Sequence, residues 1–180
     1  PASPPLAPVM GATGGEAGAK AGEAIDALRA SGVDIVVRAG DVADRDVVVA
    51  ILSEIEKDDR LVGVVHAAGV LDDASLLTLD AERLTGIWGP KVDATWHLHE
   101  LTKNMELDAF VLFSSAAAQI GSPGQANYAC ANAFMDALAG HRRAAGLPAV
   151  SIGWGPWGAS GLATEARRAW EAGGVTPLPP

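Results

Sequence analysis

Four polar side chains between residues 91 and 132 have the types and spacing that proton transfer to a carbonyl requires. They are the ammonium of Lys91, the hydroxyl of Ser115, the phenol of Tyr128 (the only tyrosine in the chain) and the amide of Asn132. An isolated phenol has a pKa of about 10, and a neighbouring ammonium lowers that pKa. We therefore expect Ser115 to hydrogen-bond a carbonyl while Tyr128, acidified by Lys91, gives it a proton.

Tyr128 and Asn132 are four residues apart within a predicted helix, so they share one face of it. Asn132 is expected to hold Lys91 on that face, directly or through water. Taken singly, each residue also has an ordinary explanation: a serine at a helix start, a half-buried tyrosine, a solvated lysine. The four together are harder to explain in that way, and they define the candidate site.

Composition limits the class of protein. With 180 residues and 49% hydrophobic content, the chain is long and apolar enough for one packed domain. A net charge of −9 argues against nucleic-acid binding and against a basic membrane-binding surface. Cys130 is the only cysteine, so neither an internal disulfide nor a thiolate metal site is expected.

Other features predict a soluble protein without metal. The histidines are not spaced as ligands, because His97 and His99 diverge on a helix. No run approaches the roughly 18 apolar residues of a membrane span, and no signal peptide begins the chain. We therefore expect a cytoplasmic location.

Short apolar runs alternate with amphipathic stretches along most of the chain. Strands are predicted over 33–37, 61–65, 110–113 and 150–153, and helices over 17–30, 45–57, 81–102 and 126–144. Asp44 caps the second helix and Gly32 follows the first. This alternation implies right-handed crossovers, and hence an α/β fold with a Rossmann-like, doubly wound parallel sheet.

Small or polar residues follow each predicted strand, where ligands bind in open parallel sheets. These residues are Asp41-Val42, Ala67-Ala68-Gly69, Ser114-Ser115 and Gly153-Trp154-Gly155-Pro156. A single glycine there is also typical of a turn. Four such segments in phase favour a flat ligand lying close to the backbone.

Three long motifs carry a family resemblance. They are VVHAAGVLDD (64–73), GPKVDATWHLHEL (89–101) and the run from Phe110 to Gly158 that contains FSSAAAQIGSPGQANYACANAF. Over roughly residues 33–165, the chain resembles the ketoreductase domain of a type I modular polyketide synthase, in the short-chain dehydrogenase/reductase superfamily. The resemblance implies Tyr128, Ser115, Lys91 and Asn132 as the catalytic residues. Asn132 stands where ordinary members of the superfamily have lysine, which is the arrangement of the polyketide branch.

The resemblance also implies an activity with its cofactor and partners. A β-ketoacyl chain, held by phosphopantetheine on an acyl carrier protein, is reduced by NADPH to a β-hydroxyacyl thioester, beside other synthase domains of the same polypeptide. Residues matching the family's cofactor contacts are Asp41 and Val42 on the adenine side, Ala67, Ala68 and Gly69 at the nicotinamide ribose, Lys91 and Tyr128, and Gly155 and Pro156 beside the nicotinamide.

One motif bears on stereochemistry. Leu71-Asp72-Asp73 matches the motif of B-type ketoreductases, which give the D-hydroxy (usually 3R) product. Ile120 stands where A-type enzymes have tryptophan, which agrees with this type. Pro123 matches a position associated with epimerising domains, but Cys130 replaces the companion proline, so α-epimerisation stays open.

The family's phosphate-binding pattern, a strand followed by TGGxGxxG, has only a superficial match. The stretch Thr13–Gly18 has Ala17 where glycine is required, and the short, proline-containing Ala7–Met10 is not expected to form the preceding strand. The chain is therefore expected to be truncated at both ends and to lack the first two strands of the fold. The strand over 33–37 would then have no neighbour, and the isolated chain would neither bind NADPH tightly nor reduce a ketone.

The resulting domain assignment has three segments. Residues 1–13 are a linker or cut end, residues 14–165 a partial catalytic domain, and residues 166–180 the start of a lid. Two alternatives remain: the ketoreductase of a multifunctional fatty acid synthase, and a non-catalytic reductase-like scaffold. Leu71-Asp72-Asp73 favours the polyketide branch, and the intact Ser115 and Tyr128 argue against a scaffold.

Overall fold

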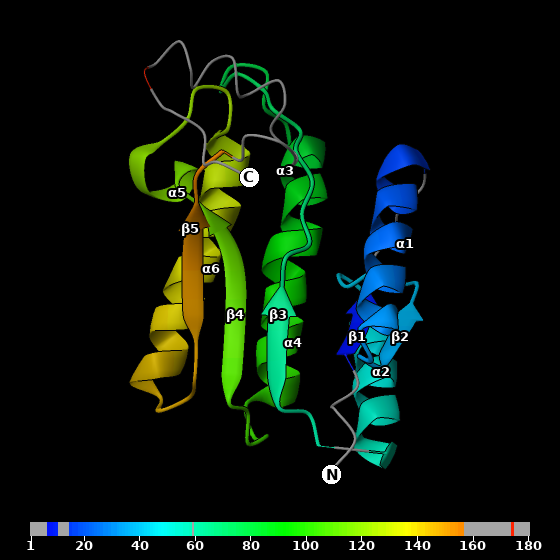
Figure 1. Cartoon of the computed structure of the whole chain (residues 1–180). Coiled ribbons are helices and arrows are strands. Elements are labelled where there is room, and N and C mark those ends of the chain that lie inside the picture. Colours follow the sequence, from blue (N-terminus) through cyan, green and yellow to red (C-terminus); the bar gives the residue numbers. More distant parts are fainter. Residues whose placement is uncertain (1–6, 11–14, 59, 157–173, 175–180) are drawn as a thin grey trace. The chain divides into compact units, whose positions relative to one another are not determined.

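The computed structural model describes residues 7–10, 15–58, 60–156 and 174. The chain divides into two compact units, Pro1–Leu61 and Val62–Pro180, which are considered one at a time. Both contain parallel strands joined through helices (Figure 1). The predicted α/β class with parallel pairing is confirmed. The predicted lid lies outside the described residues, apart from Gly174.

The first unit is a strand–helix–strand motif followed by a helix. Its elements are β1 (Ala7–Met10), α1 (Gly15–Ala30), β2 (Ile35–Arg38) and α2 (Arg45–Asp58). Gly32 follows α1 at a φ of +91°, a backbone conformation that glycine adopts without steric cost. The Asp44 carboxylate accepts the Asp46 N–H at 2.9 Å, which confirms the predicted cap of α2.

The expectation that no strand precedes the glycine-rich stretch is wrong. Ala7–Met10 forms β1, which pairs in parallel with β2, so β2 does not lack a neighbour. Among the described residues β1 is hydrogen-bonded to β2 alone, so Pro8 needs no N–H toward a second described strand. Gly15 lies at the start of α1, whereas Thr13 and Gly14 lie outside the described residues.

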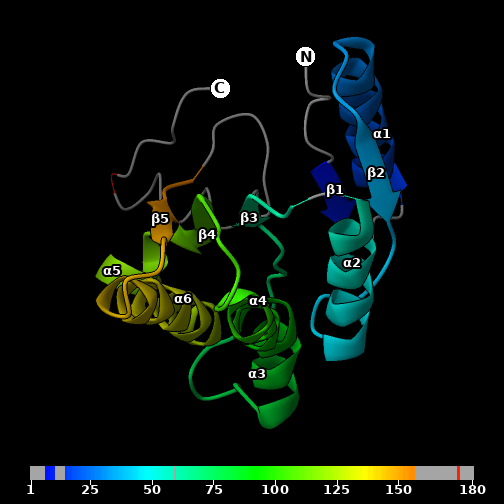
Figure 2. The same ribbon diagram turned by 90° about the horizontal axis from the view of Figure 1, so that it is seen from below.

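The second unit contains the sheet with more strands among the described residues. Among the described residues it has three parallel strands in the order β3-β4-β5, which are β3 (Gly63–His66), β4 (Ala109–Ser115) and β5 (Val150–Trp154). Helices α3 (Ala81–Trp88), α4 (Ala94–Thr102) and α6 (Ala126–Ala144) lie on one face of this sheet, as Figure 2 shows.

Buried and exposed side chains alternate along the strands, as expected for a sheet whose helices lie on one face. Val64, Phe110 and Leu112 are buried, whereas Val65 is 67% exposed. Residues two apart on a strand point to the same face, so the buried set packs beneath the helices. No helix of the part that the structure describes is long and apolar enough to cross a membrane.

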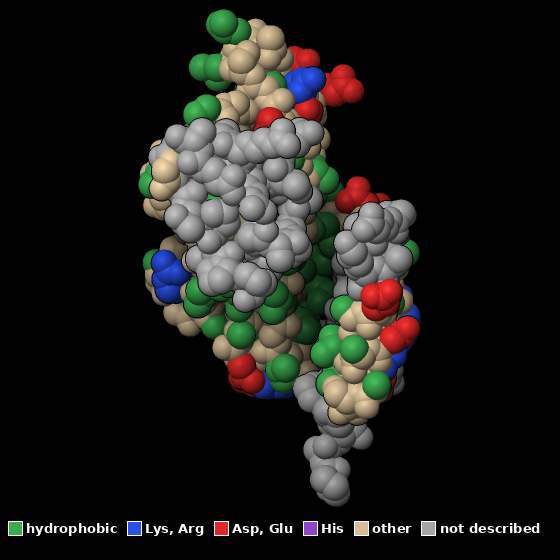
Figure 3. Space-filling model, turned by 45° about the horizontal axis from the view of Figure 1, so that its top comes forward, with side chains coloured by type: hydrophobic (Ala, Val, Ile, Leu, Met, Phe, Trp, Pro, Cys, Tyr) green, Lys and Arg blue, Asp and Glu red, His purple; other side chains and the backbone are tan. Residues whose placement is uncertain are grey.

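The surface of the chain agrees with its acidic composition. On the face in Figure 3, and among its coloured residues, the lysine and arginine side chains are few and scattered between acidic and hydrophobic ones. The described residues of this face therefore show no basic patch of the kind that binds phosphate backbones.

The single helix predicted over 81–102 is divided by a π-helical turn. This turn, η1 (Gly89–Asp93), lies between α3 and α4, and the Ala94 N–H donates to the Gly89 carbonyl five residues back. Pro90 has no N–H to donate, which leaves a gap in the α-helical ladder at this point. Such turns are frequent at functional sites, and this one carries Lys91.

The far end of α6 is anchored by a buried cation. Arg142 stacks its guanidinium 3.8 Å from the centroid of the Phe110 ring on β4. It also donates to the Pro148 carbonyl at 3.2 Å and to Nδ1 of His99 on α4 at 3.0 Å. This junction joins α6, α4 and β4 at the end of α6 that lies away from Tyr128, so it fixes the direction of the helix.

Candidate active site

The polar residues named from the sequence meet at the carboxyl ends of the second unit's strands. The segment 67–69 follows β3, Ser115 is the last residue of β4, and the segment 155–156 follows β5. Because the strands are parallel, these ends lie at one edge of the sheet (Figure 1). Ligands of open α/β sheets bind at this edge.

Lys91 is the buried centre of the site, with only 3% of its surface exposed. Its Nζ donates to Oδ1 of Asn132 at 3.1 Å and to the carbonyl of Phe113 at 3.3 Å. The same Nζ lies 5.2 Å from the centroid of the Tyr128 ring. The sequence predicted that Asn132 holds Lys91 directly or through water, and the contact is direct. Tyr128 lies on the same side of the sheet.

Asn132 is held by its own helix. Its Nδ2 donates to the Tyr128 carbonyl at 2.8 Å, one turn earlier, so its Oδ1 is left to face Lys91. Ser114 joins the same helix to β4, because its hydroxyl donates to the Asn132 carbonyl at 3.3 Å. Asn132 therefore links the ammonium to the helix that carries the phenol.

Three residues hold the turn around Lys91. Thr95 and His66 had no role assigned from the sequence, whereas the resemblance placed Gly69 at the nicotinamide ribose. Thr95 donates its hydroxyl to the Lys91 carbonyl, and His66 at the end of β3 donates Nε2–H to the Pro90 carbonyl at 2.9 Å. A Cβ on Gly69 would lie 2.8 Å from Cε of Lys91, so the lysine side chain would have to shift to admit any other residue there. The i, i+4 spacing of Thr95 from Lys91 is visible in the sequence, whereas the other two contacts are tertiary.

Burial sets the charge states of this group. It lowers the pKa of Lys91 to about 8, so the ammonium is still charged at neutral pH. Burial, with the Lys91 charge as a second cause, lowers the pKa of His66 to about 4. His66 is therefore neutral near pH 7, and its proton is on Nε2, because the Pro90 carbonyl only accepts.

The expectation that Lys91 lowers the pKa of the phenol is wrong. Burial raises the pKa of Tyr128 and the Asp73 carboxylate raises it further, while hydrogen bonding from Asn132 and Ser115 offsets this only in part. The Lys91 ammonium faces the ring and is already engaged by two acceptors. The phenol consequently keeps its proton at neutral pH, which is the state that a proton donor needs.

Ser115 is the last residue of β4, which ends two residues later than the strand predicted over 110–113. Its Oγ accepts the N–H of Ala117 at 3.2 Å, at the start of the short helix α5 (Ala117–Ile120). This contact uses an oxygen lone pair and leaves the hydroxyl hydrogen for another acceptor. Ser115 can therefore donate to a carbonyl oxygen beside Tyr128.

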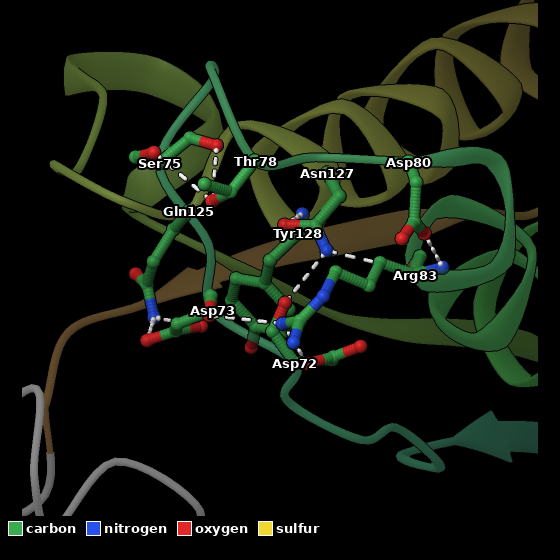
Figure 4. A network of polar contacts seen from close by, with 9 residues as sticks. All are labelled: Asp72, Asp73, Ser75, Thr78, Asp80, Arg83, Gln125, Asn127 and Tyr128. Carbon is green, nitrogen blue, oxygen red and sulfur yellow. Dashed lines mark hydrogen bonds and ion pairs between the residues drawn. The ribbon is translucent and has the colours of Figure 1, made fainter.

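The Leu71–Asp73 motif lies against the start of α6. Asp72 pairs with Arg83 of α3 at 2.6 Å, and the carboxylate of Asp73 accepts from Gln125 at 3.0 and 3.2 Å (Figure 4). Both aspartates are thus held in the structure. Each carboxylate has a side-chain partner, while Asp73 is exposed and Asp72 half-buried.

The residues matching cofactor contacts are divided between the two units. Asp41 and Val42 follow β2 in the first unit, where Asp41 accepts the Ala43 N–H at 2.9 Å. The others belong to the second unit. An ammonium has three donors, and Lys91 has two acceptors among the described residues, which leaves one N–H for a ligand hydroxyl. A hydroxyl-rich nucleotide fits this donor and the small residues at the strand ends.

Metal ions in proteins are bound by clusters of ligating side chains, chiefly histidine, cysteine, aspartate and glutamate. Within the described part of the chain, no group of histidine, cysteine and carboxylate side chains is arranged to hold an ion.

A parallel sheet with a serine, a tyrosine and a lysine beyond its strand ends defines the short-chain dehydrogenase/reductase class. The model of the KR domain family matches residues 9–159. The chain therefore belongs to this family, the ketoreductase domains of polyketide synthases.

Relatives with curated functions are polyketide synthases. The chain is 51% identical over 137 residues to mycoketide-CoA synthase of Mycobacterium tuberculosis, covering 76% of this chain and 3% of that protein. It is 58% identical over 121 residues to polyketide synthase GfsA of Streptomyces halstedii, covering 67% of this chain and 2% of that protein. The chain thus spans a small part of these relatives.

Solved structures show the same fold. An A1-type ketoreductase superimposes with a TM-score of 0.90 at 42% identity, over 97% of this chain and 37% of that one. The chain therefore spans less than half of that structure's length.

Gly69→Ala is expected to lower the free energy of unfolding by about 1–3 kcal/mol, because the added methyl forces the Lys91 stem away from its acceptors. Urea unfolding measures this loss. Gly86→Ala is the matched control: it lies in α3 with open space around its Cβ, and alanine favours a helix. A Gly69→Ala variant as stable as the Gly86→Ala variant would contradict the close approach.

Acid is expected to destabilise the protein through His66. The unfolded histidine takes up its proton near its ordinary pKa of 6.5 and the folded one only at about 4, so stability falls as the pH drops through this window. The loss amounts to at most about 3 kcal/mol. His66→Gln keeps an Nε2 donor for the Pro90 carbonyl and is expected to remove this part of the pH dependence.

Urea unfolding at pH 7 and pH 4.5 tests this expectation. His141→Gln is the control, because His141 is exposed on α6. An equal pH dependence in the His66→Gln variant and the wild type would show that His66 does not carry the effect.

Proposed function

We propose that this chain is the NADPH-dependent catalytic part of a ketoreductase that reduces a β-ketoacyl thioester on an acyl carrier protein. The product is the β-hydroxyacyl thioester, and the other domains of the same synthase are the partners. The observation that carries the proposal is the contact of Lys91 with Asn132 beneath the Tyr128 ring, at the end of the strand that bears Ser115.

Tyr128 is the proton donor in this mechanism. Its raised pKa keeps the phenol protonated at neutral pH, and Ser115 donates a hydrogen bond to the same carbonyl oxygen. Transfer of the proton leaves a negative phenolate. The buried Lys91 ammonium, with its Nζ 5.2 Å from the ring centroid, stabilises this charge as it forms.

NADPH, when bound, supplies the hydride that the β-carbon of the substrate receives. Ala67, Ala68 and Gly69 would provide the close backbone for its nicotinamide ribose, and Gly155 and Pro156 would lie beside the nicotinamide. Lys91 and Tyr128 would offer hydrogen bonds to its hydroxyl groups, while Asp41 and Val42 would contact the adenine side. These assignments rest on the family resemblance and on the fit of the Lys91 donor.

The proposed product is the D-hydroxy (3R) thioester of a B-type enzyme. Leu71, Asp72 and Asp73 support this type, and Ile120 stands at the position of the A-type tryptophan. The structural neighbours include A-type ketoreductases, so similarity of fold does not discriminate the types and the product must be measured.

Tyr128→Phe in the full-length natural protein is expected to lower kcat for ketone reduction by about 10²–10⁴-fold, because the proton donor is lost. Cys130→Ala, an exposed change on the same helix, is the control and is expected to keep wild-type kcat. Turnover is followed by NADPH oxidation with a β-ketoacyl thioester, and NADPH binding by fluorescence is expected to survive in both variants. Reduction by the Tyr128→Phe variant at the wild-type rate would refute the assignment.

The isolated 180-residue chain is expected to bind NADPH with a Kd weaker than micromolar and to leave ketones unreduced. Ala17 interrupts the glycine pattern that brings a backbone to the pyrophosphate. Fluorescence titration measures the affinity, and a micromolar Kd would contradict this expectation.

A further inference from the structure

The loop after β3 is joined to the start of α6 by the backbone. The Ala74 N–H donates to the Gly124 carbonyl at 2.8 Å, and Ala74 forms a single parallel bridge with Gln125. The catalytic candidate Tyr128 comes three residues after Gln125. The loop that contains Asp72 and Asp73 is thus fixed next to the first turn of the helix that presents the phenol (Figure 4).

Side chains from two helices complete this junction. Arg83 of α3 pairs with Asp72 at 2.6 Å, and Gln125 donates to both carboxylate oxygens of Asp73. Asn127 donates to the Asp72 carbonyl at 2.9 Å and to the Arg83 carbonyl at 3.5 Å. We call Arg83, Gln125 and Asn127 the clamp.

Asn127 connects the clamp directly to Tyr128. Its Nδ2 binds the Asp72 carbonyl while its Oδ1 accepts the Tyr128 N–H at 2.9 Å. That N–H is one of the first donors of α6, which have no partner within the helix. One amide therefore bridges the Leu71–Asp73 motif and the backbone of Tyr128.

Burial divides the clamp into two parts. Gln125 and Asn127 are 3% and 1% exposed, so breaking their hydrogen bonds leaves buried polar groups without partners. The Arg83–Asp72 pair is substantially exposed, and such pairs contribute little to stability. What that pair contributes is the direction of the Asp72 side chain and of the loop.

We propose that Arg83, Gln125 and Asn127 are positioning residues that hold the Leu71–Asp73 loop and Tyr128 in one fixed arrangement, and thereby set which face of the ketone is reduced. This inference rests on the proposed function. The influence of the Asp73 carboxylate on the pKa of Tyr128 agrees with the short reach between loop and phenol. Gln125 fixes that carboxylate through both of its oxygens.

The first test replaces Asn127 by Asp in the full-length natural protein. Asp keeps an oxygen for the Tyr128 N–H but loses the donor to the Asp72 carbonyl, so it separates capping from bridging. We expect kcat for the β-ketoacyl thioester to fall about tenfold, the size of one or two lost hydrogen bonds, with an unchanged KM for NADPH. A minor hydroxyl enantiomer is expected, measured by chiral chromatography of the product.

The second test replaces Arg83 by Met and, in parallel, by Lys. Met removes the ion pair and is expected to raise the minor enantiomer, whereas Lys keeps the charge and is expected to restore most of the wild-type ratio. Lys103→Met is the matched control, because it removes a similarly exposed ion pair with Glu100 on α4. Wild-type product ratios in both the Asn127→Asp and Arg83→Met variants would overturn the proposal.

Amide hydrogen exchange gives a readout that does not need turnover. The Ala74 amide is expected to exchange faster in the Asn127→Asp variant, because the loop loses its donor, whereas the Tyr128 amide keeps its acceptor at position 127 and is expected to exchange as in the wild type. Both amides are expected to exchange as in the wild type for Lys103→Met. If the wild type reduces no ketone, the proposed function fails, while unchanged exchange of the Ala74 amide in the Asn127→Asp variant is what refutes the clamp. Faster exchange with unchanged kcat and product ratio would show a structural junction only, and would overturn the positioning role.

Discussion

The site depends on one buried ammonium. Removing a charge from water is costly unless acceptors replace the lost hydration, and Lys91 finds its acceptors on two other elements, in Asn132 of α6 and the Phe113 carbonyl of β4. The neighbouring details serve the same need: the π turn brings the lysine inward, Gly69 leaves room for its stem, and His66 stays neutral beside it. Tyr128 is placed by the same helix that satisfies this charge.

Much of this arrangement is predictable from local patterns. The helix over 126–144 has the bounds expected from its composition, and the contact between Asn132 and Lys91 follows from placing an amide one turn after Tyr128. The strands predicted from apolar runs also end within two residues of the observed ends, because period and burial are both local signals there. Which residues gather at the edge of the second sheet is therefore readable from the sequence.

What the sequence did not predict depends on tertiary context. Pro8 argued against a strand at Ala7–Met10, yet this segment pairs in parallel with β2, the one strand to which it is hydrogen-bonded among the described residues. The π turn is hidden because Lys91 and Thr95 keep the spacing of a continuous helix. The sign of the Tyr128 pKa shift was also missed, since the distance to Lys91 says nothing of how much water the fold removes from the phenol.

The raised pKa of Tyr128 suits a proton donor better than the lowered pKa expected from the sequence. An acid poised to lose its proton at neutral pH would often lack the proton it has to give, whereas a phenol with a raised pKa always carries it. Burial becomes unfavourable only after proton transfer, when a charged phenolate remains in the partly desolvated site. Lys91, with a pKa of about 8, is still charged at that moment and faces the ring. The two residues therefore have complementary roles, because burial keeps the phenol protonated and the ammonium stabilises the phenolate once the proton has left.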